Sequence, residues 1–257
     1  MIYIPPSQTK NFIVISMLRS FYELCSTPGA FKAILTWKKF SISAFKIVKR
    51  LTSAGVAPMS VIDVGANAGQ FSVAASKEFR HANIYPIEPD PRTAKKLRHN
   101  LEPKLAANII RKAVGERDGS ITFNVNSDSQ VSSILPLGDD RQRAFPKSAV
   151  MQQISVPLAT LDSLFGDIPL AKPILLKIDV QGYEDQVILG AASFLASVSW
   201  VVMEVSFARL YEGEQDFMAI VKLMASQGFR FVRPLNFHQA GKNIDIIEMD
   251  ALFEKAS

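Results

Sequence analysis

The segment D-V-G-A-N-A-G-Q, residues 63–70, is the first whose residue types and spacing could do chemistry. It begins within the strand candidate Ser60–Val64 and leads into an amphipathic helical pattern. Gly65 and Gly69 permit positive φ and a close approach of a ligand to the backbone, and a helix start offers free N–H groups. The segment therefore predicts a nucleotide or cofactor loop at the carboxyl end of a strand.

The spacing of this segment narrows the choice of ligand. A dinucleotide loop reads G-x-G-x-x-G, but Asn67 stands where its second glycine would be. The Lys-Ser/Thr pair of a phosphate-binding loop is missing as well. Asp63 precedes Gly65 by two residues, where a carboxylate could accept a hydrogen bond from a cationic amino group. The missing second glycine therefore disfavours a dehydrogenase. If the segment binds no ligand, it is a plain αβ turn.

A second carboxylate ends the next apolar run. The strand candidate Ile84–Glu88 ends 19 residues after Gly69. A carboxylate at this tip could accept hydrogen bonds from both hydroxyls of a vicinal diol, so Glu88 suits an unphosphorylated ribose. Asp90 fits better as an ordinary acid near a helix start.

A third group is the run K-I-D-V-Q-G-Y-E at residues 177–184. Lys177 is a charge inside an apolar strand, Asp179 ends that strand, and an aromatic residue and an acid then open a helix. The carboxyl ends of parallel strands meet at one edge of a sheet, so we expect Asp179 near the loop at Gly65 and near Glu88.

The elements that must position these residues alternate from Gly55 onward, short apolar runs with amphipathic helical stretches. This alternation predicts a parallel sheet with helices on both faces. The expected strands are Ser60–Val64, Ile84–Glu88, Asn108–Ala113, Ile174–Ile178, Trp200–Val205, Phe229–Arg233 and Ile244–Met249. The expected helices are Gln70–Arg80, Pro91–Leu101, Tyr183–Leu189 and Asp216–Gln227.

Two connections depart from this alternation. Only ten residues join the last two strands, too few for a parallel crossover, so the last strand should run antiparallel. An insertion over Gly115–Leu170 holds two further strand candidates, Ser120–Asn126 and Ile154–Leu158.

The N-terminal segment, residues 1–55, has a helical pattern over Asn11–Ser26 and Phe31–Thr52. It carries eight Lys or Arg and one acid, whereas the rest of the chain carries 21 basic and 23 acidic residues. We expect a basic helical cap packed on a domain that spans residues 56–257. The alternative is an arm that makes a peripheral contact with an anionic membrane surface or a partner.

Composition excludes several classes of protein. Hydrophobic residues make up 48% of the 257 residues and charged residues 21%, which excludes a disordered chain. Cys25 is the single cysteine, so no disulfide can form within the chain and a cytoplasmic location is expected. No stretch approaches the roughly 20 apolar residues of a membrane span. The slightly acidic body of the chain disfavours a nucleic acid as partner.

The motifs together resemble the FkbM-type methyltransferases over roughly residues 57–250. The resemblance rests on the motif at 63–70, I-E-P-D at 87–90, A-V-G-E-R-D-G at 113–119, T-L-D at 160–162 and the run at 177–184. It implies a class I methyltransferase Rossmann-like α/β fold, with a seven-stranded, mostly parallel sheet that binds S-adenosyl-L-methionine and releases S-adenosyl-L-homocysteine. It further implies O-methylation of a hydroxyl on a sugar, a glycan or another small metabolite.

The resemblance also implies roles for individual residues. The methionine part of the cofactor falls on Asp63, Gly65, Asn67, Gly69 and the adjoining Gln70. The ribose falls on Glu88 and the adjoining Pro89, the adenine on Ala113 and Val114, and the sulfonium near Asp179. The pair Ser132 and Ser133 in the insertion would face the substrate.

A hydroxyl acceptor needs a group that takes its proton, and three residues are candidates. They are Asp179, Glu204 at the end of the fifth strand, and His238 in the loop between the last two strands. Asp179 and Glu204 could alternatively hold a divalent ion, although two acids without a third ligand are a weak basis for a metal site. Two other functions stay open: N-methylation, and a non-catalytic cofactor-binding scaffold whose basic arm binds a membrane or partner.

Overall fold

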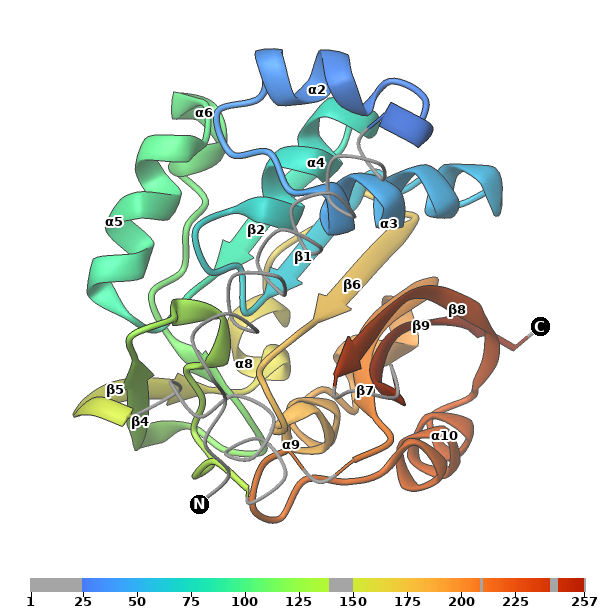
Figure 1. Cartoon of the computed structure of the whole chain (residues 1–257). Coiled ribbons are helices and arrows are strands. Elements are labelled where there is room, and N and C mark those ends of the chain that lie inside the picture. Colours follow the sequence, from blue (N-terminus) through green and yellow to red (C-terminus); the bar gives the residue numbers. More distant parts are fainter. Residues whose placement is uncertain (1–24, 139–149, 209, 241–244, 257) are drawn as a thin grey trace.

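The central sheet is the element that positions everything else (Figure 1). The computed structural model describes residues 25–138, 150–208, 210–240 and 245–256. Within them the sheet has six strands in the spatial order β2-β1-β6-β7-β9-β8. They are β1 (Ser60–Val64), β2 (Asn83–Ile87), β6 (Ile174–Ile178), β7 (Trp200–Ser206), β8 (Phe229–Ala240) and β9 (Asp245–Lys255).

The predicted class of sheet is confirmed. β1 pairs in parallel with β2 and with β6, and β6 pairs in parallel with β7. β9 runs antiparallel to both β7 and β8, as the short connection before it requires. The carboxyl ends of β1, β2, β6 and β7 therefore lie at one edge.

Helices cover both faces of the sheet, and alternate strand residues face opposite layers. Val61, Leu175 and Val202 pack with helices α3 and α4 on one face. Ile62, Leu176 and Met203 pack with α8, α9 and α10 on the other. The helices are α2 (Ala30–Thr36), α3 (Ile42–Ser53), α4 (Gln70–Glu78), α5 (Pro91–Asn100), α6 (Pro103–Ala106), α8 (Leu161–Phe165), α9 (Glu184–Leu189) and α10 (Phe217–Ser226).

The expected seventh strand, Asn108–Ala113, does not form in the described chain. Ile110 alone makes a parallel bridge with Ile87 beside β2. The chain then turns away, and β3 (Ala113–Val114) pairs with β5 (Val150–Ala159) in a second sheet of the order β3-β5-β4. β4 (Gly119–Asn126) and β5 confirm the two strands predicted in the insertion.

The expected helix Phe31–Thr52 is broken into two. Trp37 is extended, and the Ser41 side chain accepts a hydrogen bond from the backbone N–H of Ala44 and so begins α3. The expected helix over residues 11–26 lies almost wholly outside the described residues. No helix within the described ranges is long and apolar enough to cross a membrane.

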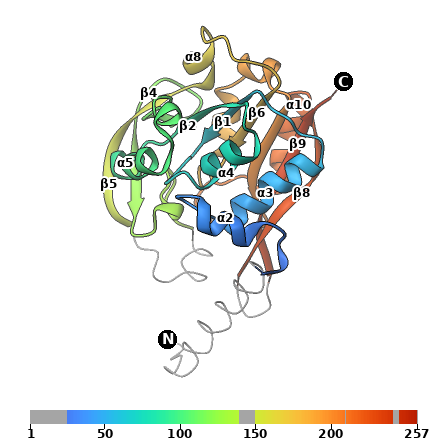
Figure 2. The same cartoon turned by 90° about the horizontal axis from the view of Figure 1, so that it is seen from above.

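Helix α3 packs into the core. Ala44, Ile47, Val48 and Leu51 join the cluster that includes Val61 of β1 and Phe71 of α4. The two helices α3 and α4 also lie side by side in Figure 2.

We expect Leu51→Ala to lower the free energy of unfolding by about 3 kcal/mol, because it leaves a cavity under α3. Leu35→Ala makes the same chemical change on α2, at a side chain that is 73% exposed. This control should shift the free energy by less than about 0.5 kcal/mol. Urea unfolding measures both values, and equal effects would contradict the packing of α3 in the core.

Candidate active site

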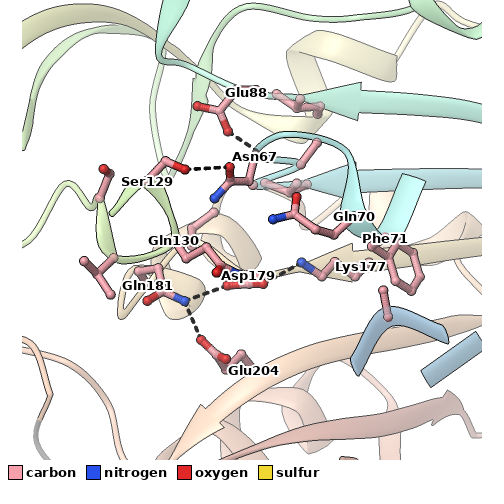
Figure 3. Close-up of a pocket in the computed structure, with 18 of the residues that line it drawn as sticks. Asn67, Gln70, Phe71, Glu88, Ser129, Gln130, Lys177, Asp179, Gln181 and Glu204 are labelled. Carbon is pink, nitrogen blue, oxygen red and sulfur yellow. Dashed lines mark hydrogen bonds and ion pairs between the residues drawn. The ribbon is translucent and has the colours of Figure 1, made fainter. Parts of the chain in front are cut away.

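A cavity of about 360 Å³ opens at the edge where the parallel strands end. Its walls come from the loops after β1, β2 and β6, from β7, β8 and β9, from residues 128–132 and from the start of α3. Figure 3 shows the polar side chains that converge on it from these elements. Several strands and the loops that follow them thus contribute side chains to one cavity, as expected for an α/β ligand site.

Glu88 closes one end of the cavity. Its Oε2 accepts a hydrogen bond from the backbone N–H of Asn67 at 2.9 Å, and its Oε1 from that of Asp90 at 3.0 Å. Burial raises the pKa of Glu88 to about 7, although these two hydrogen bonds act to lower it. A carboxylate can accept about four hydrogen bonds, so each oxygen keeps capacity for a ligand.

Asn67 connects this end to the insertion. Its backbone is left-handed, with φ of 48°, and its Oδ1 accepts hydrogen bonds from Ala68 N–H at 2.6 Å and from the Ser129 hydroxyl at 3.0 Å. The asparagine is suited to this turn because its short polar side chain tolerates the left-handed region. The cofactor loop and the turn at 128–132 are therefore held together.

Gly65 is required by the neighbouring strand. Its φ is 78°, and a Cβ built there would lie 1.8 Å from the backbone oxygen of Asp179. Gly69, with φ of 94°, packs against Leu97 and does not line the cavity. The two glycines thus bring the β1 loop against β6 and α5, and Gly65 sets the depth of the cavity beside Asp179.

An ion cluster of Lys177, Asp179 and Asp63 forms part of the cavity wall and extends behind it. Lys177 Nζ is 2.8 Å from Asp179 Oδ2 and 3.8 Å from Asp63 Oδ1. Burial alone would lower the pKa of Lys177, but the carboxylates of Asp179 and Asp63 raise it above its ordinary value. Burial would likewise raise the pKa of Asp179, and Lys177 instead holds it below its ordinary value.

Asp63 belongs to the foundation of the site. It is fully buried, does not line the cavity, and accepts a hydrogen bond from the Ser72 hydroxyl of α4 at 2.5 Å. Burial raises the pKa of Asp63, and Lys177 acts against that shift. Its described contacts favour an indirect role, in which Asp63 holds Lys177 in place.

Gln181 joins the two carboxylates that face the cavity. Its Nε2 donates to Asp179 Oδ1 at 2.8 Å and to Glu204 Oε2 at 2.6 Å (Figure 3). The Tyr211 hydroxyl donates to its Oε1 at 2.7 Å, and the Ser133 hydroxyl donates to its backbone oxygen at 2.6 Å. With a left-handed φ of 61°, Gln181 is held by four hydrogen bonds in a conformation that a non-glycine residue rarely adopts.

The pKa values of Glu204 and Asp179 are shifted in opposite directions. Burial raises the pKa of Glu204 well above its ordinary value, and the nearby carboxylates of Asp179, Glu248 and Asp250 raise it further. Lys177 holds Asp179 ionised. Two carboxyl groups with pKa values pushed apart are typical of acid–base sites.

His238 lies inside β8, where it pairs with Glu248 of β9, so its expected place in a loop is wrong. The hairpin of β8 and β9 is longer than predicted and brings this part of the chain into the cavity wall. The Nε2 of His238 is 3.5 Å from Asp250 and 3.8 Å from Glu204. Asp250 raises the pKa of His238, which favours its protonated form.

The other residues predicted for the site either line the cavity or lie behind its wall. Gln70, Pro89, Ala113, Val114 and Ser132 line the cavity. Ser133 is buried and does not line the cavity. Its hydroxyl donates a hydrogen bond to the backbone oxygen of Gln181, which does line it. No group of three or more His, Cys, Asp or Glu side chains is placed to hold a metal ion in the described ranges.

Sequence reasoning missed several polar cavity residues, among them Ser129, Gln181, Glu248 and Asp250. Gln181 had a signal, since Gly182 follows it and an acid ends the same run. Glu248 and Asp250 had none, because they face the cavity only through the antiparallel pairing of β9 with β7.

Comparison with known proteins shows which methyltransferases this chain resembles in sequence. Residues 63–231 match the sequence model of the methyltransferase FkbM domain. A 2-O-methyltransferase, NoeI, from Sinorhizobium fredii is 30% identical over 194 residues, which is 72% of this chain and 79% of that protein. A hexuronic acid methyltransferase, AglP, from Haloferax volcanii is 28% identical over 146 residues, which is 56% of this chain and 54% of that protein.

Among solved structures, the chain is similar to magnesium protoporphyrin IX methyltransferase (ChlM) from Synechocystis PCC 6803 with bound SAM. The identity is 11% and the TM-score 0.46, with 83% of this chain and 78% of that chain covered.

The close approach at Gly65 gives a test of how the site is built. Gly65→Ala should lower the free energy of unfolding by about 4 kcal/mol or prevent folding, because its Cβ would overlap the Asp179 carbonyl. Gly55→Ala is the matched control, with φ of 82° and no atom within 4 Å of the added Cβ. It should cost only the backbone strain, about 1 kcal/mol. Similar losses for both variants in urea unfolding would remove the steric argument.

Proposed function

The chain belongs to the FkbM methyltransferase family, and we propose that it transfers a methyl group from S-adenosyl-L-methionine to a hydroxyl oxygen of a sugar. The observation that carries the proposal is the pair Asp179 and Glu204, bridged by Gln181 in a cavity whose other end is Glu88. The names of the two relatives, a 2-O-methyltransferase and a hexuronic acid methyltransferase, support oxygen and a sugar as acceptor.

The residues of the cavity fit this cofactor. Glu88 is buried, and its carboxylate keeps capacity to accept from two ribose hydroxyls after its two backbone hydrogen bonds. Ala113 and Val114 offer an apolar wall for the adenine. Asn67, Gly65 and Gln70 border the cavity between Glu88 and Asp179, where the methionine part would lie. When bound, the cofactor would supply an electrophilic methyl group on a sulfonium.

The carboxylates would then prepare the acceptor. Asp179, held ionised by Lys177, would accept a hydrogen bond from the acceptor hydroxyl and orient its oxygen. Glu204 would take the proton, because its raised pKa makes its ionised form the stronger base of the two. Gln181 would hold both carboxylates in position. His238 is a weaker candidate for the base because Asp250 favours its protonated form.

The acceptor end of the cavity favours an uncharged sugar. Asp179, Glu204, Glu248 and Asp250 all line it, against the two cationic candidates Lys177 and His238. Carboxylates accept hydrogen bonds from sugar hydroxyls, whereas they repel the carboxylate of a sugar acid. No separate observation favours N-methylation. The acid–base pair Asp179 and Glu204 supports an enzyme over a non-catalytic scaffold.

The Glu88 carboxylate predicts how cofactor binding depends on pH. Its pKa of about 7 means that it gains a proton as the pH falls from 8 to 6, and a protonated carboxyl accepts fewer hydrogen bonds. The affinity for S-adenosyl-L-homocysteine should therefore fall about tenfold between pH 8 and pH 6.

Glu88→Gln provides the control. It should bind at least about tenfold more weakly than the wild type at pH 8, since charge-assisted hydrogen bonds are lost, and should show little change with pH. Titration calorimetry measures both proteins. Wild-type affinity in Glu88→Gln would remove Glu88 from the ribose site.

Transfer to sugars can be tested with labelled S-adenosyl-L-methionine and matched 4-nitrophenyl hexosides and hexuronides. We expect label on the hexosides and little on the hexuronides. In this assay Asp179→Asn and Glu204→Gln should each lower kcat by about 10²-fold. The rate of the wild type should rise with pH as Glu204 ionises, and Glu204→Gln should lose that rise.

His238→Asn is the comparison variant and should lower kcat by less than about tenfold, because it leaves both carboxylates in place. A larger loss in His238→Asn than in Glu204→Gln would transfer the role of base to His238. Label that enters only amine acceptors would replace O-methylation by N-methylation.

A further inference from the structure

Helix α2 carries its large apolar side chains on the outside. It buries Ala30 and Ala33 against Phe45, while Phe31, Ile34 and Leu35 are 60%, 44% and 73% exposed. Positions 31, 34 and 35 fall on one face of a helix, and Ile34 at its edge adjoins the side that buries Ala30 and Ala33. Figures 1 and 2 both place α2 at the periphery of the molecule, beside α3. An exposed apolar face of this kind is typical of a surface that contacts a partner or a membrane.

The surroundings of this face are basic. Residues 25–62 contain six Lys or Arg and no acid. Lys49 forms an ion pair with Glu78, and Arg50 donates a hydrogen bond to the backbone oxygen of Leu235. Lys32 and Lys38 are exposed and form no ion pair with any residue in the part of the chain that is described. Lys32 and Lys38 therefore place exposed ammonium groups beside the apolar face. Lys38 also interacts with the carboxylate of Glu102, whose pKa is lowered chiefly by Lys77 and in part by Lys38.

We propose that α2 docks on an anionic lipid surface, with Phe31, Ile34 and Leu35 among the acyl chains and Lys32 and Lys38 on the headgroups. Stable attachment needs two signals, and an apolar face beside a basic patch supplies both. A second copy of this chain fits less well, because a twofold contact through α2 would bring its lysines against one another.

The location of α2 connects this surface to the cavity. Four residues, 37–40, join α2 to Ser41, and Ser41, Ser43 and Ala44 at the start of α3 line the cavity. A protein attached through α2 would hold its acceptor end close to the lipid. The docking itself does not depend on methyl transfer.

Flotation of the full-length protein with vesicles tests the proposal. We expect binding to phosphatidylglycerol–phosphatidylcholine vesicles, none to pure phosphatidylcholine, and release near 1 M salt, where the Debye length is about 3 Å. Phe31→Ser/Leu35→Ser and Lys32→Glu/Lys38→Glu should each lower the partition coefficient at least about tenfold.

The controls make substitutions of the same kind on α10, one residue at a time. Met218 is 57% exposed and Lys222 is exposed, so Met218→Ser and Lys222→Glu should bind vesicles within about twofold of the wild type. All variants should keep wild-type affinity for S-adenosyl-L-homocysteine, which separates a failure of docking from a failure of the proposed enzyme.

Three results would overturn the proposal. The first is wild-type protein that ignores anionic vesicles at low salt. The second is a self-association that Phe31→Ser/Leu35→Ser abolishes, without vesicle binding, which would assign the face to a second copy. The third is a marked loss of thermal stability in Phe31→Ser/Leu35→Ser, which would show that the chain itself covers the face.

Discussion

The buried ammonium group of Lys177 is the constraint on which the site depends. A buried cation is stable only with carboxylates around it, and the register of the sheet supplies them. β1 and β6 pair with Asp63 directly beside Lys177, and Asp179 follows two residues later on the same face of its strand. A slip of one residue in that register would turn Lys177 to the other face and leave Asp63 without its cation.

The charge of Lys177 also divides the proton affinities of the two cavity carboxylates. Asp179 is held ionised, and its negative charge, together with burial and other acids, raises the pKa of Glu204. Gln181 can donate to both groups because its Nε2 has two hydrogens. Tyr211 donates to the side-chain oxygen of Gln181 and Ser133 to its backbone oxygen, and these two donors lie far apart in the sequence. The charges at this end of the cavity thus depend on the pairing of β1 with β6 and on the left-handed backbone of Gln181.

The parts of this structure that could be predicted are those that local sequence determines. The apolar runs predicted both ends of β1 and β6 correctly, and the short final connection predicted that the last strand is antiparallel. The missing seventh strand and the break at Trp37 could not be predicted, because pairing with β5 and capping by Ser41 compete with a continuous local pattern. For the same reason Asp63 and Ser133 were expected in the cavity, although they lie behind it and support residues that line it.

The two ends of the cavity therefore differ in origin. The end at Glu88 is made by loops that follow β1 and β2, within the stretch that matches the family. The end at Asp179 and Glu204 also has walls from the β8–β9 hairpin and the start of α3, and Asn236 of β8 donates to the Ser43 hydroxyl of α3 at 2.8 Å. Residues 41–44 lie before the matched stretch, which begins at 63. The N-terminal segment thus contributes to the cavity wall through the start of α3, although it lies outside the stretch that matches the family.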